Sequence, residues 1–486
     1  MNRPTLSRAV RIVLAVLAGI LFHFALRLTP WWPAAWLAPI PLLVAAFHAG
    51  GSEARLLAWL AAAIGLSSNF TYYLTTAGPP AAVVVMLLQM LLWGYLVGRA
   101  RAAVLARPAW PAIFVFPVLL AAFATLIARI SPHGTWGSYA YTQMDAVPVI
   151  QIASVLGAPA IEFLVALFAS TAAVAIYRGR QMERPWLAYG LPVVLLAAGL
   201  GFGELRLRRA GIEPTVKVGV ASIDDFIGGR VPADHAEAVW RGYDETVARL
   251  AARGARIVVL PEKIGALSED EAARRQAHLA SLARGAGVYL MVGVQLNHPH
   301  QKDNVAWLFS PAGELLAEYH KQHMVPHLEG DLTPGNEEMV RQIDGTPFGL
   351  AICRDMIFTS FGRSYGLLGV PAMLAPAWDF YRDAWMASNV AALRGVENGY
   401  AVVRAGRESY LNVSDRYGRT VARRRSDFLP GSSLLADLPI GPAAPTFYAR
   451  HGDIFGWLMV AASIWLVFVQ PAMAKRSRAA YREAQK

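Results

Sequence analysis

The sequence predicts a polytopic α-helical membrane domain that carries a separate α/β sandwich domain. Composition is the first indication: 55% of the 486 residues are hydrophobic and only 16% are charged, which is too apolar for a soluble chain of this length. The second indication is a set of eight long apolar stretches. The third is a polar block between the seventh and eighth stretches, in which short apolar runs alternate with helical patterns.

Each apolar stretch is long enough to cross a bilayer, because about 20 apolar residues suffice for a transmembrane helix. Gly19, Gly65 and Gly94 lie inside these stretches, where they indicate close helix packing rather than breaks. We expect transmembrane helices at residues 9–28, 33–50, 55–75, 79–99, 109–129, 155–177, 186–204 and 454–472.

Lysine and arginine predict the orientation of these helices, because short cytoplasmic loops carry an excess of both. They precede the first stretch and follow the second, fourth, sixth and eighth, whereas the alternate loops nearly lack them. We therefore expect both termini in the cytoplasm. The expected domains are a membrane domain of about seven helices at 1–209, an extracytoplasmic domain at 210–450, and a transmembrane helix with a basic cytoplasmic tail at 451–486.

The net charge of +11 is explained largely by this topological signal. No RNA-binding signature accompanies it, so we expect no nucleic acid partner. The arginines at 423–425 and around Arg206 have two interpretations, namely solvated charge or contacts with phospholipid headgroups. The first apolar stretch lacks a clear small-residue cleavage site, and we interpret it as an uncleaved anchor.

Residues 210–450 show a pattern of alternating strands and helices. A helix start is marked by Ser268, because acidic residues as far as Glu271 fill the turn that follows it. Hairpins near 304–319 and 401–420 complete the pattern of an α/β sandwich. Short apolar runs predict buried strands at 216–221, 256–260, 288–294, 305–309 and 347–352, and helical patterns occupy 233–253, 268–284 and 383–398.

Cys353 is the only cysteine of the chain, and it follows one of these predicted strands. A lone cysteine in this position can be an inert core thiol or a nucleophile. The domain is expected on the oxidising side of a membrane, where cysteines are normally paired or absent, and this favours a reactive thiol. A thiol with a pKa near 8.5 is only about 3% ionised at pH 7, so the site needs a base and a cation.

Glu262 and Lys321 are the candidates for these two groups. Glu262 follows the predicted strand 256–260, and α/β proteins place their sites at the carboxyl ends of strands. Lys321 also follows a strand and precedes a turn that Pro326 stiffens. A proline followed by an acid is common in solvated turns too, so Pro261 and Glu262 alone do not define a site.

The ordered set Pro261-Glu262, His320-Lys321 and Ile352-Cys353 resembles the Glu-Lys-Cys triad of the carbon-nitrogen hydrolase (nitrilase) superfamily. This resemblance implies a nitrilase-like αββα sandwich in which Glu262 is the general base, Cys353 the nucleophile and Lys321 the cation that stabilises the oxyanion. Glu329 matches a second glutamate that supports the triad. The whole chain resembles the bacterial apolipoprotein N-acyltransferases, through the segments 36–43, 131–138, 321–326 and 446–453.

The resemblance implies an enzyme of the bacterial inner membrane whose catalytic domain lies on the periplasmic side. It would transfer a fatty acyl group from a phospholipid, through a thioester on Cys353, to the N-terminal amine of a diacylated lipoprotein. His320, His323 and His327 could suggest zinc, but they do not fall on one helical face and they bracket Lys321. We therefore expect no metal and no cofactor.

The chain also departs from the family pattern. Arg354-Asp355 stands where Tyr-Glu is typical, Lys263 where threonine is typical, and His327-Leu-Glu329 and Ala375-Pro-Ala-Trp-Asp379 are altered as well. Because Cys-Arg-Asp is closer to soluble amidases, a membrane-anchored amidase with the same triad stays open as the alternative. A catalytically inactive relative that serves as a binding scaffold is the third hypothesis, and the intact triad argues against it.

Overall fold

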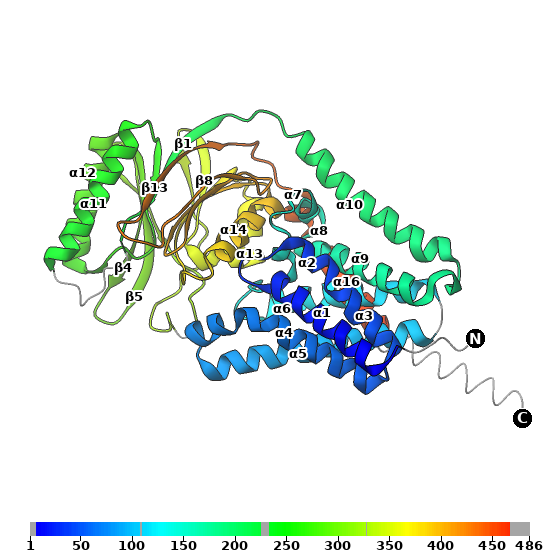
Figure 1. Cartoon of the computed structure of the whole chain (residues 1–486). Helices are drawn as coiled ribbons and strands as arrows, with labels where there is room; N and C mark the ends of the chain where they lie inside the picture. The colour runs from blue at the N-terminus through cyan, green and yellow to red at the C-terminus, as the bar shows by residue number, and fades with distance from the viewer. Residues whose placement is uncertain (1–5, 107–108, 225–232, 327, 467–486) are drawn as a thin grey trace, which may run out of the picture. The chain divides into compact units, whose positions relative to one another are not determined.

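The computed structural model of the protein describes residues 6–106, 109–224, 233–326 and 328–466 (Figure 1). The chain forms two compact units, which we describe separately. The first comprises Met1–Ser131, Gly137–Arg206 and His451–Lys486, and the second comprises Pro132–Trp136 and Leu207–Arg450.

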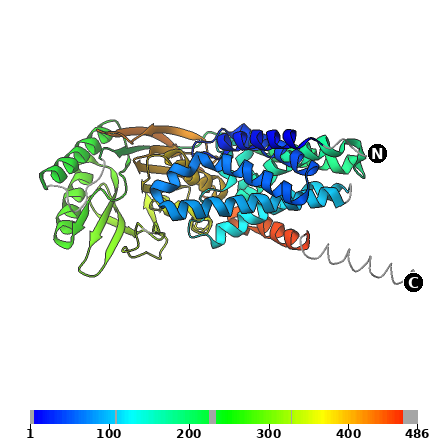
Figure 2. The same cartoon turned by 60° about the horizontal axis from the view of Figure 1, so that its bottom comes forward.

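The first unit is helical. Neighbouring helices α1, α4 and α5 run side by side (Figure 2). Two glycines allow the close approach of α1 and α4, because a Cβ at Gly19 would lie 2.8 Å from Cβ of Ile64 and one at Gly65 would lie 2.6 Å from Cβ of Phe22. The main helices of the unit are α1 (Arg8–Leu26), α2 (Trp32–Leu37), α3 (Pro39–His48), α4 (Gly51–Thr76), α5 (Pro79–Ala106), α6 (Val115–Ile130), α9 (Ala158–Arg178), α10 (Leu191–Arg208) and α16 (Ile454–Ile464).

Five helical segments of the described residues are long and apolar enough to cross a membrane. They are Arg8–Leu26, Pro79–Ala106, Trp110–Ile130, Ala158–Gln181 and Trp186–Arg208. The expected count of eight is not confirmed, because Trp32–His48 and Ile454–Ile464 are shorter apolar helices and α4 is too polar to be counted with the five. The predicted stretch 454–472 extends beyond the described residues.

The second unit is an α/β sandwich of two sheets. The first sheet has the strand order β13-β1-β2-β4-β5-β6, with β3 paired to β4, and the second has the order β12-β11-β10-β9-β8-β7. The strands of the first sheet are β1 (Thr215–Ser222), β2 (Ile257–Val259), β3 (Ala266–Ser268), β4 (Tyr289–Asn297), β5 (Lys302–Phe309), β6 (Leu315–His320) and β13 (Ser432–Pro439). Those of the second are β7 (Val340–Ile343), β8 (Thr346–Leu350), β9 (Ala372–Trp378), β10 (Ala401–Arg407), β11 (Tyr410–Ser414) and β12 (Thr420–Arg425).

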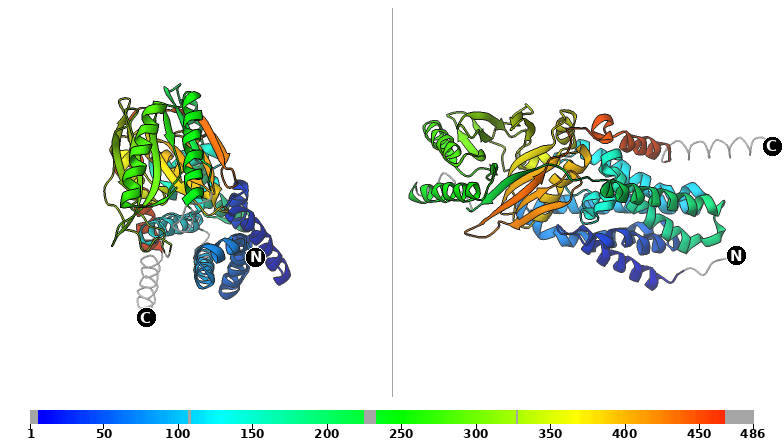
Figure 3. Two further views of the ribbon diagram at one scale, coloured as in Figure 1. Left: turned by 90° about the vertical axis from the view of Figure 1, so that its left-hand side faces the viewer. Right: turned by 90° about the horizontal axis from the view of Figure 1, so that it is seen from above.

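Helices cover the outer faces of both sheets. Helices α11 (Ala233–Ala252) and α12 (Glu269–Ala286) cover the first sheet (Figure 3), and Trp240, Tyr243 and Leu279 of these helices pack on it. Helices α13 (Thr359–Leu367) and α14 (Ala384–Asn398) lie against the second sheet. Apolar side chains from both sheets, such as Val259 and Leu350, form one core between them. The αββα sandwich that the sequence predicted is therefore confirmed.

Strand direction brings several strand ends to one edge of each sheet. In the first sheet, β2 is parallel to β4. Strand β5 is antiparallel to β4 and to β6, so β6 has the same direction as β4. In the second sheet, β8, β9 and β10 are parallel. The two edges meet where the amide of Glu262, after β2, approaches the carbonyl of Ala377 in β9 at 3.5 Å.

Candidate active site

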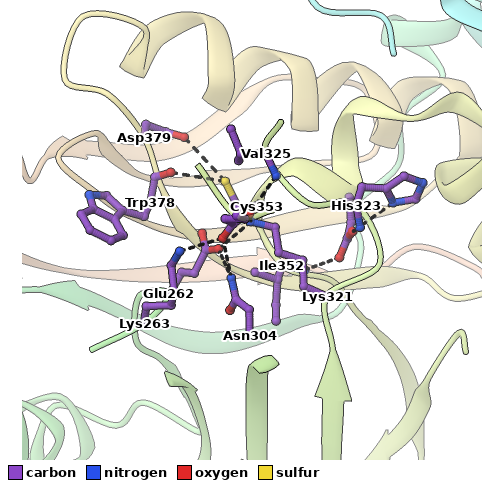
Figure 4. Close-up of polar contacts among 12 residues, drawn as sticks. Glu262, Lys263, Asn304, Lys321, His323, Val325, Ile352, Cys353, Trp378 and Asp379 are labelled. Atoms are coloured by element: carbon purple, nitrogen blue, oxygen red, sulfur yellow. Dashed lines mark hydrogen bonds and ion pairs between the residues drawn. The ribbon is translucent and has the colours of Figure 1, made fainter. Parts of the chain in front are cut away.

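The four residues predicted from the sequence come together at these strand ends. Glu262 follows β2, Lys321 follows β6 and Cys353 follows β8 (Figure 4). Glu329 lies in the loop after Lys321. Glu262 and Lys321 are each 1% exposed and Glu329 is 3% exposed. Buried ionised groups are costly unless they are paired, so their arrangement has to satisfy each charge.

The turn that carries Glu262 is held against β4 by a glycine. The amide of Gly293 donates to the carbonyl of Pro261 at 3.1 Å, and the amide of Ile264 donates to the carbonyl of Gly293 at 2.9 Å. A Cβ at Gly293 would lie 2.5 Å from the carbonyl oxygen of Pro261 and 2.6 Å from Cα of Glu262. Only glycine therefore allows the backbone of this turn to come so close to the strand.

Lys321, Glu262, Glu329 and Asn304 form a closed ring of hydrogen bonds, which we call the Lys321 ring. Nζ of Lys321 lies 2.8 Å from Oε1 of Glu262 and 2.7 Å from Oε2 of Glu329. Asn304, on β5, closes the ring by donating to Oε1 of Glu262 at 2.6 Å and to Oε1 of Glu329 at 3.0 Å. The amide of Val325 also donates to Oε2 of Glu329 at 2.8 Å. The lysine and both carboxylates are thus fixed in place before any substrate binds.

One carboxylate oxygen of this ring stays free. Among the described residues, the buried Oε2 of Glu262 has no hydrogen-bond partner, whereas Oε1 accepts from both Lys321 and Asn304. A buried oxygen without a partner loses its hydration without compensation. It is therefore the carboxylate oxygen of the ring that remains available to a neighbouring donor.

Cys353 presents its thiol from a strained turn. Its φ is +44°, in the left-handed region that residues other than glycine rarely adopt. The 3-10 turn Cys353–Ile357 begins here, and the amide of Asp355 donates to the carbonyl of Ile352 at 3.0 Å. Sγ lies 3.4 Å from the carbonyl oxygen of Trp378 and 4.0 Å from Oδ1 of Asp379. The thiol is thus held on the sharp turn that ends the strand, at the margin of the core between the sheets.

Burial and the carboxylate of Glu262 favour the protonated form of the thiol. Burial raises the pKa of Cys353 above its ordinary value, and the nearby carboxylate of Glu262 raises it further, against the opposite effect of Lys321. Burial alone would lower the pKa of Lys321, but the carboxylates of Glu262 and Glu329 raise it above its ordinary value. The lysine stays an ammonium, so a base has to take the thiol proton during attack.

Asp355 ties the cysteine turn to the lysine segment. Its fully buried carboxylate accepts from the amides of Gln322 at 3.1 Å and His323 at 2.9 Å, and from the amide of Ile352 at 3.0 Å. The hydroxyl of Tyr319, on β6, donates to it at 2.8 Å. One carboxylate therefore fixes the distance between the segments that carry Lys321 and Cys353.

Arg354, the residue between Cys353 and Asp355, also makes contacts within the protein. Its Nη2 donates to the carbonyl of Pro132, and Oγ1 of Thr135 donates to the carbonyl of Ile357 at 2.7 Å. The segment Pro132–Trp136 belongs to the same compact unit as the cysteine turn although it is distant in the sequence. Arg354-Asp355, which departs from the family pattern, thus serves to support the turn.

A second buried ion pair faces the thiol from the other strand ends. Arg404 of β10 donates to both oxygens of Asp379, at 2.8 Å and 2.6 Å, and Ser409 also bonds this carboxylate. Burial lowers the pKa of Arg404, but Asp379 outweighs this effect and raises it above its ordinary value. The positive charge of Arg404 therefore lies directly against this carboxylate.

The histidines near Lys321 have other contacts. The ring of His320 lies 3.3 Å from Glu318, and that of His323 lies 3.0 Å from Oδ1 of Asp355 and stacks on Phe358. His327 lies outside the described residues.

No sequence pattern indicated Asn304 or Arg404 as members of the site. Asn304 follows Asp303 and directly precedes the apolar run of β5, where a single amide side chain has no characteristic spacing to its partners. Lys263, Asp355 and Asp379 were visible only as departures from the family pattern. A search for buried polar residues at strand ends would have found them, but burial is known only from the fold.

Comparison with known proteins matches both units. Residues 18–171 match the family described as apolipoprotein N-acyltransferase N-terminal domain, and residues 227–413 match the carbon-nitrogen hydrolase family. The chain is 26% identical to an apolipoprotein N-acyltransferase of Geobacter metallireducens, over 93% of each chain. It is 23% identical to one of Vibrio cholerae, over 95% of this chain and 98% of that protein. Among solved structures, an amidase from Nesterenkonia sp. aligns with 50% of this chain and 94% of its own, at 20% identity and a TM-score of 0.41.

The second unit therefore defines a protein of the carbon-nitrogen hydrolase class. Its relatives extend over nearly the whole chain, and the N-terminal match adds the helical unit. This chain belongs to the apolipoprotein N-acyltransferase family.

Proposed function

We propose that this protein transfers a fatty acyl group from a phospholipid, through a thioester on Cys353, to the N-terminal amine of a diacylglyceryl-cysteine lipoprotein. The names of its relatives support the lipoprotein acceptor. One observation carries the chemistry, namely the unpartnered Oε2 of Glu262 near a thiol on a strained turn, with the ammonium of Lys321 fixed beside both.

In the first half-reaction the thiol attacks the ester carbonyl of the phospholipid. Oε2 of Glu262 takes the thiol proton as the bond from sulfur to carbon forms. Lys321 stabilises the negative oxygen of the tetrahedral intermediate. When the intermediate collapses, Glu262 returns the proton to the leaving alcohol, so a lysophospholipid departs and an acyl thioester stays on Cys353.

In the second half-reaction the neutral α-amine of the lipoprotein attacks the thioester carbonyl. Glu262 removes a proton from the amine, the bond from carbon to sulfur breaks, and the proton passes to the leaving thiolate. The products are an amide and the original thiol. The same three groups therefore serve both halves, and the net reaction exchanges an ester for an amide.

We place the protein in the bacterial inner membrane with its second unit on the periplasmic side. The apolar helices of the first unit and the family support a membrane protein. The pattern of cations along the sequence supports the orientation. Both substrates are lipids on this view, so lateral diffusion in the bilayer would deliver them.

The test is intact-mass spectrometry of the full-length protein in detergent after incubation with phospholipid vesicles. We expect a fatty-acyl mass on Cys353 that neutral hydroxylamine removes. A diacylated lipopeptide should discharge it and become an amide, and the same lipopeptide with a blocked N-terminus should not. If no adduct forms and small amides are hydrolysed steadily, the protein is an amidase and the proposal is wrong.

A further inference from the structure

Lys263 is built into the site although no sequence motif assigns it a role. It follows Glu262 directly, its φ is +51°, and Arg407 donates to its carbonyl at 3.2 Å. Its Nζ lies 2.7 Å from Oε1 of Glu329 and 5.4 Å from the centre of the Trp378 ring. The side chain is only 14% exposed. A lysine in a solvated turn would not adopt a left-handed backbone to point its ammonium inwards.

The Lys321 ring explains what a second lysine can do there. The ring holds two carboxylates and one ammonium, so without Lys263 it carries a net negative charge close to the thiol. Negative charge opposes both thiolate formation and the oxyanion. With Lys263 the four ionised groups balance. Asp379 and Arg404, which also face the thiol, already balance each other.

The two lysines contact different oxygens of Glu329. Its Oε2 accepts from Lys321 and from the amide of Val325, and its Oε1 accepts from Lys263 and Asn304. Glu329 would therefore keep three donors if Lys321 moved towards a substrate. Without Lys263, the same movement would leave a buried carboxylate with no cation, which is costly.

We propose that Lys263 is a positioning residue that holds Glu329 in place and supplies the second positive charge of the site, which lets Lys321 turn its charge towards the oxyanion. This inference rests on the proposed use of Cys353 as the nucleophile. The family pattern that the sequence resembles has threonine at this position, and threonine can supply neither the charge nor the reach.

The test measures the alkylation rate of Cys353 by iodoacetamide between pH 6 and pH 10, in the full-length protein in detergent. The chain has a single cysteine, so one added mass reports one site. Among the described residues, the charged groups that act most strongly on the thiol are Glu262, Lys321, Asp379 and Arg404, and none of them is substituted in the variants. We expect Lys263→Met to raise the pH of half-maximal rate by about one unit, the scale of losing a nearby opposite charge, and Lys263→Arg to stay close to the wild type.

A double variant separates charge from packing. Glu329→Gln should lower the pH midpoint, because it leaves the site with one excess positive charge. Lys263→Met combined with Glu329→Gln should return it to the wild-type value, because the remaining Lys321 and Glu262 balance. Lys302→Met is the matched control, since Lys302 forms a pair of 2.8 Å with Asp331 on the exposed surface, and it should not shift the midpoint.

Coincident profiles for the wild type and Lys263→Met would overturn the inference, as would a double variant displaced further than Lys263→Met. If Lys263→Met does not fold, the comparison of Glu329→Gln with the double variant measures the same change of charge. A failure of the proposed function looks different. In that case the variants keep this order of pH midpoints, but phospholipid never forms an acyl adduct on the wild-type protein.

Discussion

At the scale of single residues, catalysis by this site depends on the thiol of Cys353. Cys353→Ala should abolish acyl transfer and leave the fold intact, because the residue lies on a turn at a strand end and only one sulfur atom is removed. Glu262→Gln and Lys321→Ala should each lower the rate at least about a hundredfold, the scale of losing a general base or one oxyanion donor. Activity assays with melting temperatures for each variant would check this. Near-normal turnover of Cys353→Ala would return the thiol to an inert role.

Glu329 gives a prediction about pH. Burial raises the pKa of this carboxyl, but Lys321 and Lys263 outweigh burial and lower it to about 2 from an ordinary value of 4.5. A lowered pKa stabilises the fold above the ordinary value, and this stabilisation is lost as the pH falls from about 4.5 towards 2. The melting temperature of Glu329→Gln should therefore lie below that of the wild type at pH 7, and the gap should close on acidification.

Asp331→Asn is the matched control for that measurement. Asp331 pairs with Lys302 at 2.8 Å, but both side chains are largely solvated, and exposed pairs contribute little to stability. The melting temperature of this variant should follow the wild type at every pH. An equal effect of both substitutions would show that the buried position of Glu329 has no special importance.

At the scale of elements, the strands that precede the site residues could be predicted from the sequence, but the pairing of strands that are distant in the sequence could not. The runs before Glu262 and Cys353 are short, apolar and β-rich, so their strands were readable from the sequence. Strand β13 was not, because it pairs with β1 across more than 200 residues and only the fold brings the two together. The predicted strand 347–352 ends at Leu350, because the chain leaves the ladder to form the cysteine turn.

The close contact between Gly293 of β4 and the Glu262 turn predicts the effect of adding one methyl group at Gly293. Gly293→Ala would place a Cβ within 2.6 Å of the turn backbone, so either the turn or the strand has to move. We expect a lower melting temperature and a loss of activity larger than the loss of stability explains, because the turn carries Glu262.

Gly285→Ala is the control for Gly293→Ala. Gly285 lies in helix α12, and an added Cβ there would meet nothing within 4 Å. Alanine is the better helix former, so this variant should be more stable by about 0.5–1 kcal/mol with unchanged activity. A neutral Gly293→Ala would show that the turn tolerates displacement.

At the scale of the whole molecule, the number of membrane crossings determines where the C-terminus lies. If all eight predicted stretches cross, seven precede residues 210–450 and one follows, so both termini share the cytoplasmic side. If only the five apolar segments of the structure cross, all five precede the second unit. Five and seven are both odd, so in either case the second unit lies opposite the N-terminus. Only the C-terminus differs, because in the second case nothing crosses after that unit.

Two reporter fusions distinguish these arrangements. A reporter that is active only in the cytoplasm should be inactive when inserted near Ser268, whichever count holds. Fused after Lys486, it should be active with eight crossings and inactive with five. We expect activity, because lysines and arginines cluster at 475–486, as they do on the cytoplasmic side of other helices. An active insertion near Ser268 would contradict both arrangements, because it would place the Lys321 ring and Cys353 in the cytoplasm. That side is away from the lipoprotein that the proposed reaction requires.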